Sequence, residues 1–111
     1  MLDIKGVDIM ANIPDVLKVK NSGYDLLMEN EKVRVMEMRL DPEQVSPMHN
    51  HPHDHVVYVF KDAEFRLSFP DEKSNDFQLK KGQALWIEAG PHKTENIGST
   101  PGHNLVIEIK D

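Results

Sequence analysis

The stretch that decides the fold joins a histidine cluster to an apolar run. It reads Pro47-Met48-His49-Asn50-His51-Pro52-His53-Asp54-His55 and continues as Val56-Val57-Tyr58-Val59-Phe60. The cluster places four histidines within seven residues, and neutral imidazole is the most common transition-metal ligand among side chains. The β-branched and aromatic run that follows predicts a strand covered on both faces. The stretch therefore predicts a metal site carried by a β-sheet.

Short strand signals continue on both sides of this stretch. Residues 33–40 are rich in branched and apolar side chains, and residues 64–69 alternate, with Phe65, Leu67 and Phe69 on one face. Further strands are predicted at 77–80, 84–87, 94–97 and 105–109, with turns at 70–75, 89–91 and 98–102. Such short strands, spaced roughly 8–12 residues apart, are typical of an all-β sandwich or barrel.

The first thirty residues are less regular than the rest of the chain. Residues 14–19 predict either a short helix with proline at its first position or an extended arm, and Asn21-Ser22-Gly23 predicts a turn. We therefore expect residues 1–30 to form an N-terminal arm that crosses the surface of the domain or of a partner subunit. Residues 31–111 are expected to form a single barrel domain.

Composition excludes several classes of function. The net charge is -6, and no cluster of lysine or arginine could neutralise a run of phosphates, which argues against nucleic acid and anionic membranes. The chain has no cysteine, so disulfides, thiolate metal sites and cysteine nucleophiles are excluded. No secretory signal or membrane-spanning apolar run is visible, so we expect a cytoplasmic protein.

Strand geometry narrows the choice of metal ligands. His49 and His51 are two residues apart, so in a regular strand both side chains point to the same face and can coordinate one ion. Pro52 is expected to bend the chain, which leaves the directions of His53 and His55 open. His92 follows a Gly-Pro turn at the start of a predicted strand, and a barrel can bring that strand against the one that carries His49 and His51.

With these residues in view, the sequence resembles the cupin superfamily. The first cupin motif, Gly-x5-His-x-His-x3,4-Glu-x6-Gly, is matched by His49 and His51, with His55 where the family places a glutamate. The second, Gly-x5-Pro-x-Gly-x2-His-x3-Asn, is matched by residues 82–96, with Gly90, His92 and Asn96 present and one residue missing before His92. The opening glycine of the first motif is absent. The chain is also similar to small single-domain cupins, some of which are labelled β-alanine degradation protein.

The resemblance implies a conical, jelly-roll β-barrel of two antiparallel sheets with a metal near its wide mouth. It also implies a homodimer, often with exchanged N-terminal strands, which would make residues 1–30 an intersubunit arm. Carried over to this sequence, the ligands would be His49, His51, His55 and His92. His53 has no place in the motif and is expected to be a bystander.

Four imidazoles without a carboxylate leave a divalent ion with its full charge, so the site should favour an anionic ligand or substrate. Imidazole suits Zn, Fe, Ni and Cu, and the sequence does not choose among them. Four histidines could close a tetrahedral structural zinc or leave two open positions on an octahedral iron or nickel. Metal affinity should fall as the pH drops through ~6.5, because each ligand must be neutral.

Several residues near the two motifs are candidates for supporting roles. Tyr58, Glu88 and Glu95 are the candidate catalytic groups, and Asp54 and Asn96 join the two glutamates as residues that could orient imidazoles. Four side chains are candidates for lining the pocket, namely Met48, Tyr58, Phe60 and Trp86.

Two functions of different classes are compatible with these residues. The first is a metal-dependent enzyme, dioxygenase-like or isomerase-like, that acts on a small carboxylate or keto compound. The second is a non-catalytic cupin that binds or senses a small ligand and holds a structural metal. The absence of a carboxylate from the predicted ligand set favours the first, and the shortage of an evident acid or base beside the ligands favours the second.

Overall fold

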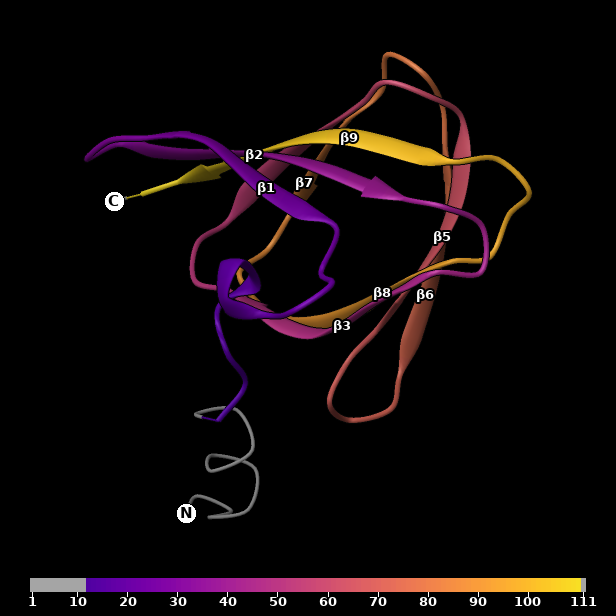
Figure 1. Cartoon of the computed structure of the whole chain (residues 1–111), viewed down its shortest axis with the longest axis horizontal. Coiled ribbons are helices and arrows are strands. Elements are labelled where there is room, and N and C mark those ends of the chain that lie inside the picture. Colours follow the sequence, from indigo (N-terminus) through magenta and orange to yellow (C-terminus); the bar gives the residue numbers. More distant parts are fainter. Residues whose placement is uncertain (1–11, 111) are drawn as a thin grey trace.

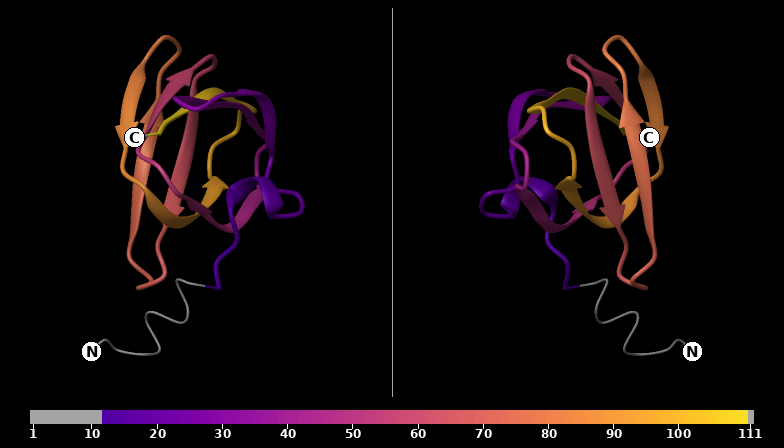
Figure 2. Two further views of the ribbon diagram at one scale, coloured as in Figure 1. Left: turned by 90° about the vertical axis from the view of Figure 1, so that its left-hand side faces the viewer. Right: turned by 90° about the vertical axis from the view of Figure 1, so that its right-hand side faces the viewer.

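Two antiparallel sheets face each other in the computed structural model, which describes residues 12–110 (Figure 1, Figure 2). The five-stranded sheet has the order β1 (Tyr24–Glu29), β2 (Val33–Leu40), β9 (Gly102–Ile109), β4 (His55–Val59) and β7 (Ala84–Ile87). The four-stranded sheet has the order β3 (Val45–His51), β8 (Gly90–Asn96), β5 (Ala63–Ser68) and β6 (Ser74–Leu79). The predicted all-β barrel of two antiparallel sheets is confirmed.

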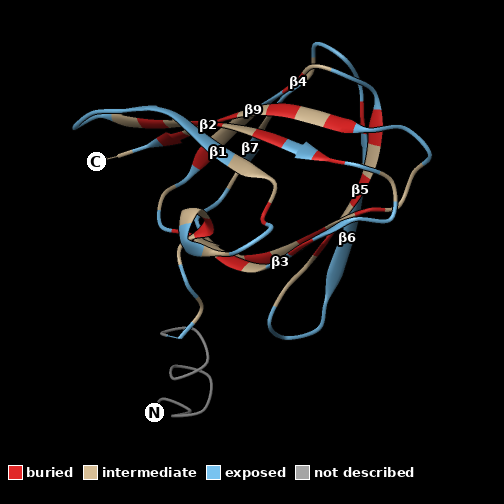
Figure 3. Cartoon of the chain, in the orientation of Figure 1, coloured by how far each residue is buried: buried red, intermediate tan, exposed pale blue. Residues whose placement is uncertain are grey.

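Strict alternation along the strands separates the interior from the surface. Residues 34, 36, 38 and 40 of β2 are buried, as are residues 102, 104, 106 and 108 of β9, and buried bands alternate with partly buried or exposed ones along both strands in Figure 3. The predicted inward face of β5 is confirmed for Phe65 and Leu67. The apolar part of the core comprises Val16, Met36, Met38, Leu40, Val59, Ala63, Phe65, Leu79 and Val106.

The outer face of β4 differs from the expectation that this strand is covered on both sides. Val57 and Val59 point inward, but Tyr58 lies on the outer face and is 40% exposed. The apolar run at residues 56–60 is continuous because the outward-facing residues of β4 are also apolar. Within residues 12–110, no other element covers this outer face. Strand β8 also begins earlier than predicted, at Gly90, so the expected turn at 89–91 is already partly strand.

The start of the described chain packs onto the barrel. A 3-10 turn, η1 (Val16–Lys18), buries Val16 completely, and Asp15 caps it by accepting a hydrogen bond from the amide of Leu17. The next segment was not predicted as a strand, yet it forms β1 and pairs with β2 of the same chain. Gly23 permits this approach: its φ is +85°, and a Cβ there would lie 2.5 Å from the Arg39 carbonyl oxygen.

The proposed arm is therefore described only from residue 12 onward. Residues 1–11 lie outside the described part of the chain, and an intersubunit role for the arm stays a prediction. Within residues 12–110, no helix combines the length and apolar character needed to cross a membrane.

Candidate metal centre

Three histidines meet inside the barrel from two neighbouring strands. Strand β3 has a bulge between Ser46 and His49. Because of this bulge, the side chains of Ser46 and His49 are both buried, although residues three apart in a regular strand point to opposite faces. His49 then lies directly opposite His92 in the register of β3 and β8. This pairing confirms that the barrel brings the strand of His92 against the strand that carries His49 and His51.

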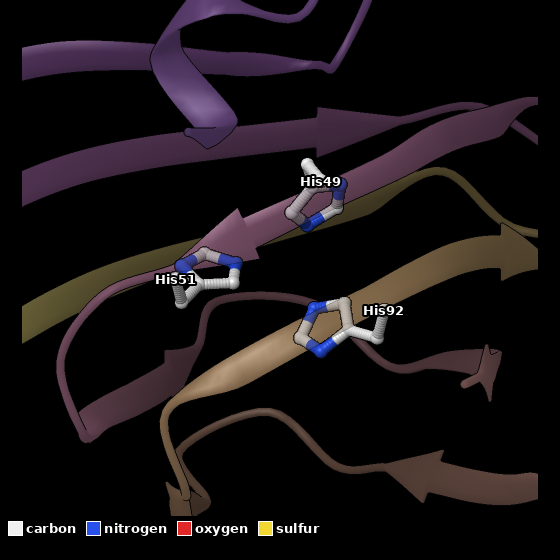
Figure 4. A group of neighbouring side chains, drawn as sticks. All are labelled: His49, His51 and His92. Carbon is white, nitrogen blue, oxygen red and sulfur yellow. The ribbon is translucent and has the colours of Figure 1, made fainter. Parts of the chain in front are cut away.

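The imidazoles of His49, His51 and His92 converge on one point (Figure 4). One ring nitrogen from each lies within 4.8 Å of the other two, and the three residues are between 0% and 4% exposed. The rings of His49 and His92 are 4.8 Å apart between centroids, and those of His51 and His92 are 5.0 Å apart. A group of this size and composition can hold a metal ion.

Hydrogen bonds fix which nitrogen each ring presents. The Nδ1 of His49 lies 2.7 Å from the Pro47 carbonyl oxygen, and the Nδ1 of His51 lies 2.8 Å from a carboxylate oxygen of Glu108. Because these oxygens only accept, Nδ1 carries the proton in both rings and Nε2 keeps its lone pair. Both Nε2 atoms are buried without a hydrogen-bond partner. A divalent transition metal is the partner that such a donor set fits.

His55 lies next to this group. Its Nδ1 donates to the His53 carbonyl oxygen at 3.0 Å, and its ring stacks on that of His51 with 4.3 Å between centroids. The same tautomer argument therefore leaves the Nε2 of His55 as an acceptor. His53 acts here through its backbone, and its side chain is only half-buried. A fourth ligand at His55 stays a prediction, because the convergent group contains three histidines.

A buried ion pair stands behind His51. Glu108, 0% exposed, accepts hydrogen bonds from both the Nε and an Nη of Arg34 at 2.9 and 3.0 Å while it also holds His51. Arg34 reaches Asp15 as well, at 3.0 Å, so the capping residue of η1 joins the same network. This chain has His55 where the first cupin motif has a glutamate, and its buried carboxylate, Glu108, orients His51 through Nδ1.

A tyrosine from β1 packs against two of the histidines. The ring of Tyr24 meets those of His49 and His51 edge-on, each with 5.4 Å between centroids. Burial, and then the charge of Glu108, raise the pKa of the Tyr24 hydroxyl above its ordinary value. Tyr24 therefore stays protonated near neutral pH.

A narrow cavity of about 50 Å3 lies between the two sheets. His55 and His92 line it together with Tyr24, and the rest of its wall is mostly apolar. A broader surface depression, bounded in part by Trp86 and Glu88, also reaches His92. His92 thus borders both the interior cavity and the surface from which a small molecule would approach.

The three predicted catalytic candidates lie elsewhere on the barrel. Tyr58 is on the outer face of β4 with its ring against Phe60, so it does not reach the histidines. Glu88 is exposed after β7 at the edge of the surface depression. Glu95 alternates with the inward residues of β8 and faces outward.

Two of the residues expected to orient imidazoles make their side-chain hydrogen bonds elsewhere. Asp54 accepts from the Ala89 amide, and Asn96 donates to the carbonyl oxygens of Leu40 and Thr100, so both brace loops. Glu108 performs the predicted role instead, and sequence reasoning missed it. The signal was present, because alternation along residues 102–109 places a charged Glu108 on the same face as Val106.

The lining of the interior cavity also differs from the prediction. Met48, Tyr58 and Phe60 do not border it, and Trp86 borders only the surface depression. Phe60 packs against His103 at 4.8 Å between centroids, away from the cluster. The tyrosine at the site is Tyr24, from the segment whose sequence showed the least regular pattern.

Burial controls the protonation of the cluster. Desolvation, followed by repulsion from the neighbouring histidines, lowers the pKa of both His51 and His92 to about 2. Burial likewise lowers the pKa of His49 and of His55. The four imidazoles are therefore neutral at physiological pH, which is the state that binds a metal. Because these pKa values are lowered, the fall in metal affinity that the sequence placed near pH ~6.5 is expected at lower pH.

The metal-free protein should lose stability as the pH falls. In the unfolded chain His51 and His92 have a pKa of about 6.5, so between pH ~6.5 and ~2 the unfolded state binds more protons. The contribution of these neutral histidines to the free energy of unfolding is then fully present above pH ~6.5. Below that pH it falls by about 1.4 kcal/mol per pH unit for each histidine. Urea unfolding of chelator-treated protein between pH 7.5 and 5 measures this slope. His92→Leu should flatten it and His53→Leu should not, whereas a constant midpoint would contradict the expectation.

Replacing Glu108 by glutamine should weaken metal binding. The neutral amide no longer stabilises the His51 N–H as the carboxylate does, so affinity should fall by about 10–100-fold. Competitive titration with a chromophoric chelator measures the affinity. Glu37→Gln is the matched control, because Glu37 makes a similar contact with His103, at 2.6 Å, outside the cluster. Equal affinity in Glu108→Gln and wild type would show that the buried carboxylate does not tune the site.

Comparisons with known proteins agree with this architecture. The family model described as a cupin domain matches residues 36–108. A cupin domain from Bordetella pertussis Tohama I is 29% identical with a TM-score of 0.72, over 79% of this chain and 92% of that chain. An RmlC-like cupin with a double-stranded β-helix fold from Methanocaldococcus jannaschii is 16% identical with a TM-score of 0.64, over 82% and 84% of the two chains. No curated protein matches the sequence. With its two sheets, its paired histidine motifs and a family match over more than half of its length, this chain belongs to the cupin family.

Proposed function

We propose that this chain is a metal-dependent cupin enzyme, dioxygenase-like or isomerase-like, that acts on a small carboxylate or keto compound. The observation that carries the proposal is the pair of buried, unpartnered Nε2 atoms of His49 and His51, which converge with His92 beside a cavity. These three residues would hold the ion, with His55 as a fourth ligand. A divalent ion bound there would polarise a carboxylate or carbonyl oxygen of the substrate.

The chain's own residues would perform the remaining tasks. Glu108 holds His51 in one tautomer, and the Pro47 carbonyl does the same for His49. Tyr24, whose ring lies against those of His49 and His51 and which also lines the cavity, would donate a proton or a hydrogen bond to the bound substrate. The apolar cavity wall excludes water from a bound substrate and strengthens every polar contact within it.

A non-catalytic ligand-binding cupin is the alternative, and one observation favours it. Among residues 12–110, the carboxylate that contacts the cluster is Glu108, and Arg34 already occupies both of its oxygens. Glu108 is therefore not available as a general base beside the histidines. Under this alternative the metal would be structural and the cavity would serve recognition.

Metal analysis combined with anion titration separates these functions. We expect about one divalent transition metal per chain after purification without chelator, loss of that metal in His92→Ala and its retention in His53→Ala. Cobalt-substituted protein should change its visible spectrum when azide or a small carboxylate is added, because an enzyme requires open positions on its metal. A stoichiometric zinc that no anion perturbs would overturn the enzyme proposal in favour of the structural alternative.

We also propose that the protein is a homodimer whose subunits meet through the outer face of the five-stranded sheet. One apolar row crosses all five strands in register, formed by Met28, Val35, Ile107, Val56 and Trp86. Trp86 is 57% exposed within the single chain. Because a two-fold axis repeats one patch on both subunits, a row of this kind can cover its own copy.

The dimer is tested by mass. Light scattering on a sizing column at 100 µM should give twice the chain mass for wild type, whereas Trp86→Glu places a charge in the apolar row and should give the monomer. Val45→Glu is the matched control, since Val45 is 40% exposed on β3 of the other sheet. A monomeric wild type, or a dimer that survives Trp86→Glu, would contradict this interface.

The similarity to cupins labelled β-alanine degradation protein stays a prediction, as does the cytoplasmic location. Neither is needed for the metal, anion or mass measurements described above.

A further inference from the structure

Two polar side chains in the cavity wall lack the partners that buried groups require. The hydroxyl of Thr94 and the amide oxygen of Asn104 make no hydrogen bond within the described chain, although these residues are only 1% and 2% exposed. Buried polar atoms are nearly always paired, because an unpaired one loses its water without compensation. Such atoms in a cavity wall point to a ligand that would satisfy them.

Both residues line the cavity that the metal cluster borders. Thr94 is two residues beyond His92 on β8 and therefore shares its inward face, while Asn104 comes from the inward face of β9 in the other sheet. A molecule held at the histidines and extending inward would thus pass between the two sheets toward these polar atoms.

The cavity sets the size of that molecule. Its volume of about 50 Å3 corresponds to roughly four non-hydrogen atoms if each takes the ~10–15 Å3 that one water needs. The substrate portion inside the barrel is therefore a short chain, with an anionic group left at the cluster.

Charge and hydrogen-bonding capacity set its chemistry. No aspartate, glutamate, lysine or arginine of the described residues lines this cavity. An ammonium or a second carboxylate would therefore be buried without a counter-charge, which is costly. The amide oxygen of Asn104 can only accept, and the Thr94 hydroxyl can donate and accept, so an uncharged hydroxyl satisfies both.

We propose that Thr94 and Asn104 select a short carboxylate or keto acid that carries a hydroxyl group at its far end. The proposal rests on the proposed function for the anionic end, which the histidine cluster would bind. It adds the substrate class, a hydroxy acid, and assigns the recognition of its hydroxyl to these two residues.

A set of size-matched ligands tests this selection by calorimetry on metal-loaded protein. 4-Hydroxybutanoate and pentanoate each place four non-hydrogen atoms beyond the carboxylate, and 4-aminobutanoate and malonate, which also place four, supply the charged alternatives. Wild type should prefer 4-hydroxybutanoate over pentanoate by about tenfold or more, because pentanoate leaves both polar atoms unpaired. Equal affinity for these two ligands, or tighter binding of either charged ligand, would overturn the proposal.

Variants assign the preference to the two residues. The double variant Thr94→Val with Asn104→Leu should bind pentanoate more tightly than 4-hydroxybutanoate. Thr94→Ser keeps the hydroxyl group and should keep the wild-type preference for 4-hydroxybutanoate. The double variant should also raise the thermal midpoint of ligand-free protein, since it removes unpaired polar atoms. A preference that the double variant leaves unchanged would show that other residues read the hydroxyl.

Failure of the metal function is distinguishable from failure of this proposal. If elemental analysis finds no metal in wild type, the proposed function falls, and the same ligands are titrated into metal-free protein by NMR. In that titration, selection by the pair is supported if wild type still prefers the hydroxyl ligand while the double variant Thr94→Val with Asn104→Leu does not. A wild type without a preference for the hydroxyl ligand overturns the proposal.

Discussion

The structure depends on one buried carboxylate. Glu108 lies at the end of β9, where it joins Arg34 of β2 to His51 of β3, and through Arg34 it reaches Asp15 at the start of η1. Removing one partner of a buried pair typically costs about 3–5 kcal/mol, because the other charge is left without compensation. The same network that ties the two sheets and the N-terminal turn together therefore also sets which ring nitrogen of His51 keeps its lone pair.

Much of the fold follows from local pattern. Richness in branched and apolar residues located β2 with its observed bounds. Period-two alternation located the inward face of β5, because one side of that strand contacts an apolar core. The spacing of His49 and His51 gave their common direction for the same reason. The pairing of their strand with that of His92 could be anticipated because a barrel of two sheets brings remote strands together.

Other parts of the site were not predictable from neighbouring residues. Tyr58 lies in a segment with a clear sequence signal for a strand, and Tyr24 lies in a segment without one, yet it is Tyr24 that contacts the histidines. The order of the strands in the sheets, and not their propensity, decides which ring reaches the interior. β1 was missed because it gains its stability by pairing with β2 at a sheet edge. The partnerless state of Thr94 and Asn104 is visible only once the surrounding side chains are placed.

The distance along the chain between the partners of the site has a kinetic consequence. The Glu108 bond to His51 spans 57 residues and its bond to Arg34 spans 74, so the long loops must close before the cluster acquires its final orientation. During synthesis, the ribosome releases the four histidines of residues 49–55 well before Glu108. The tautomer of His51 is therefore fixed only after β9 docks, so an ion that met the nascent chain earlier would find this imidazole not yet held in one tautomer.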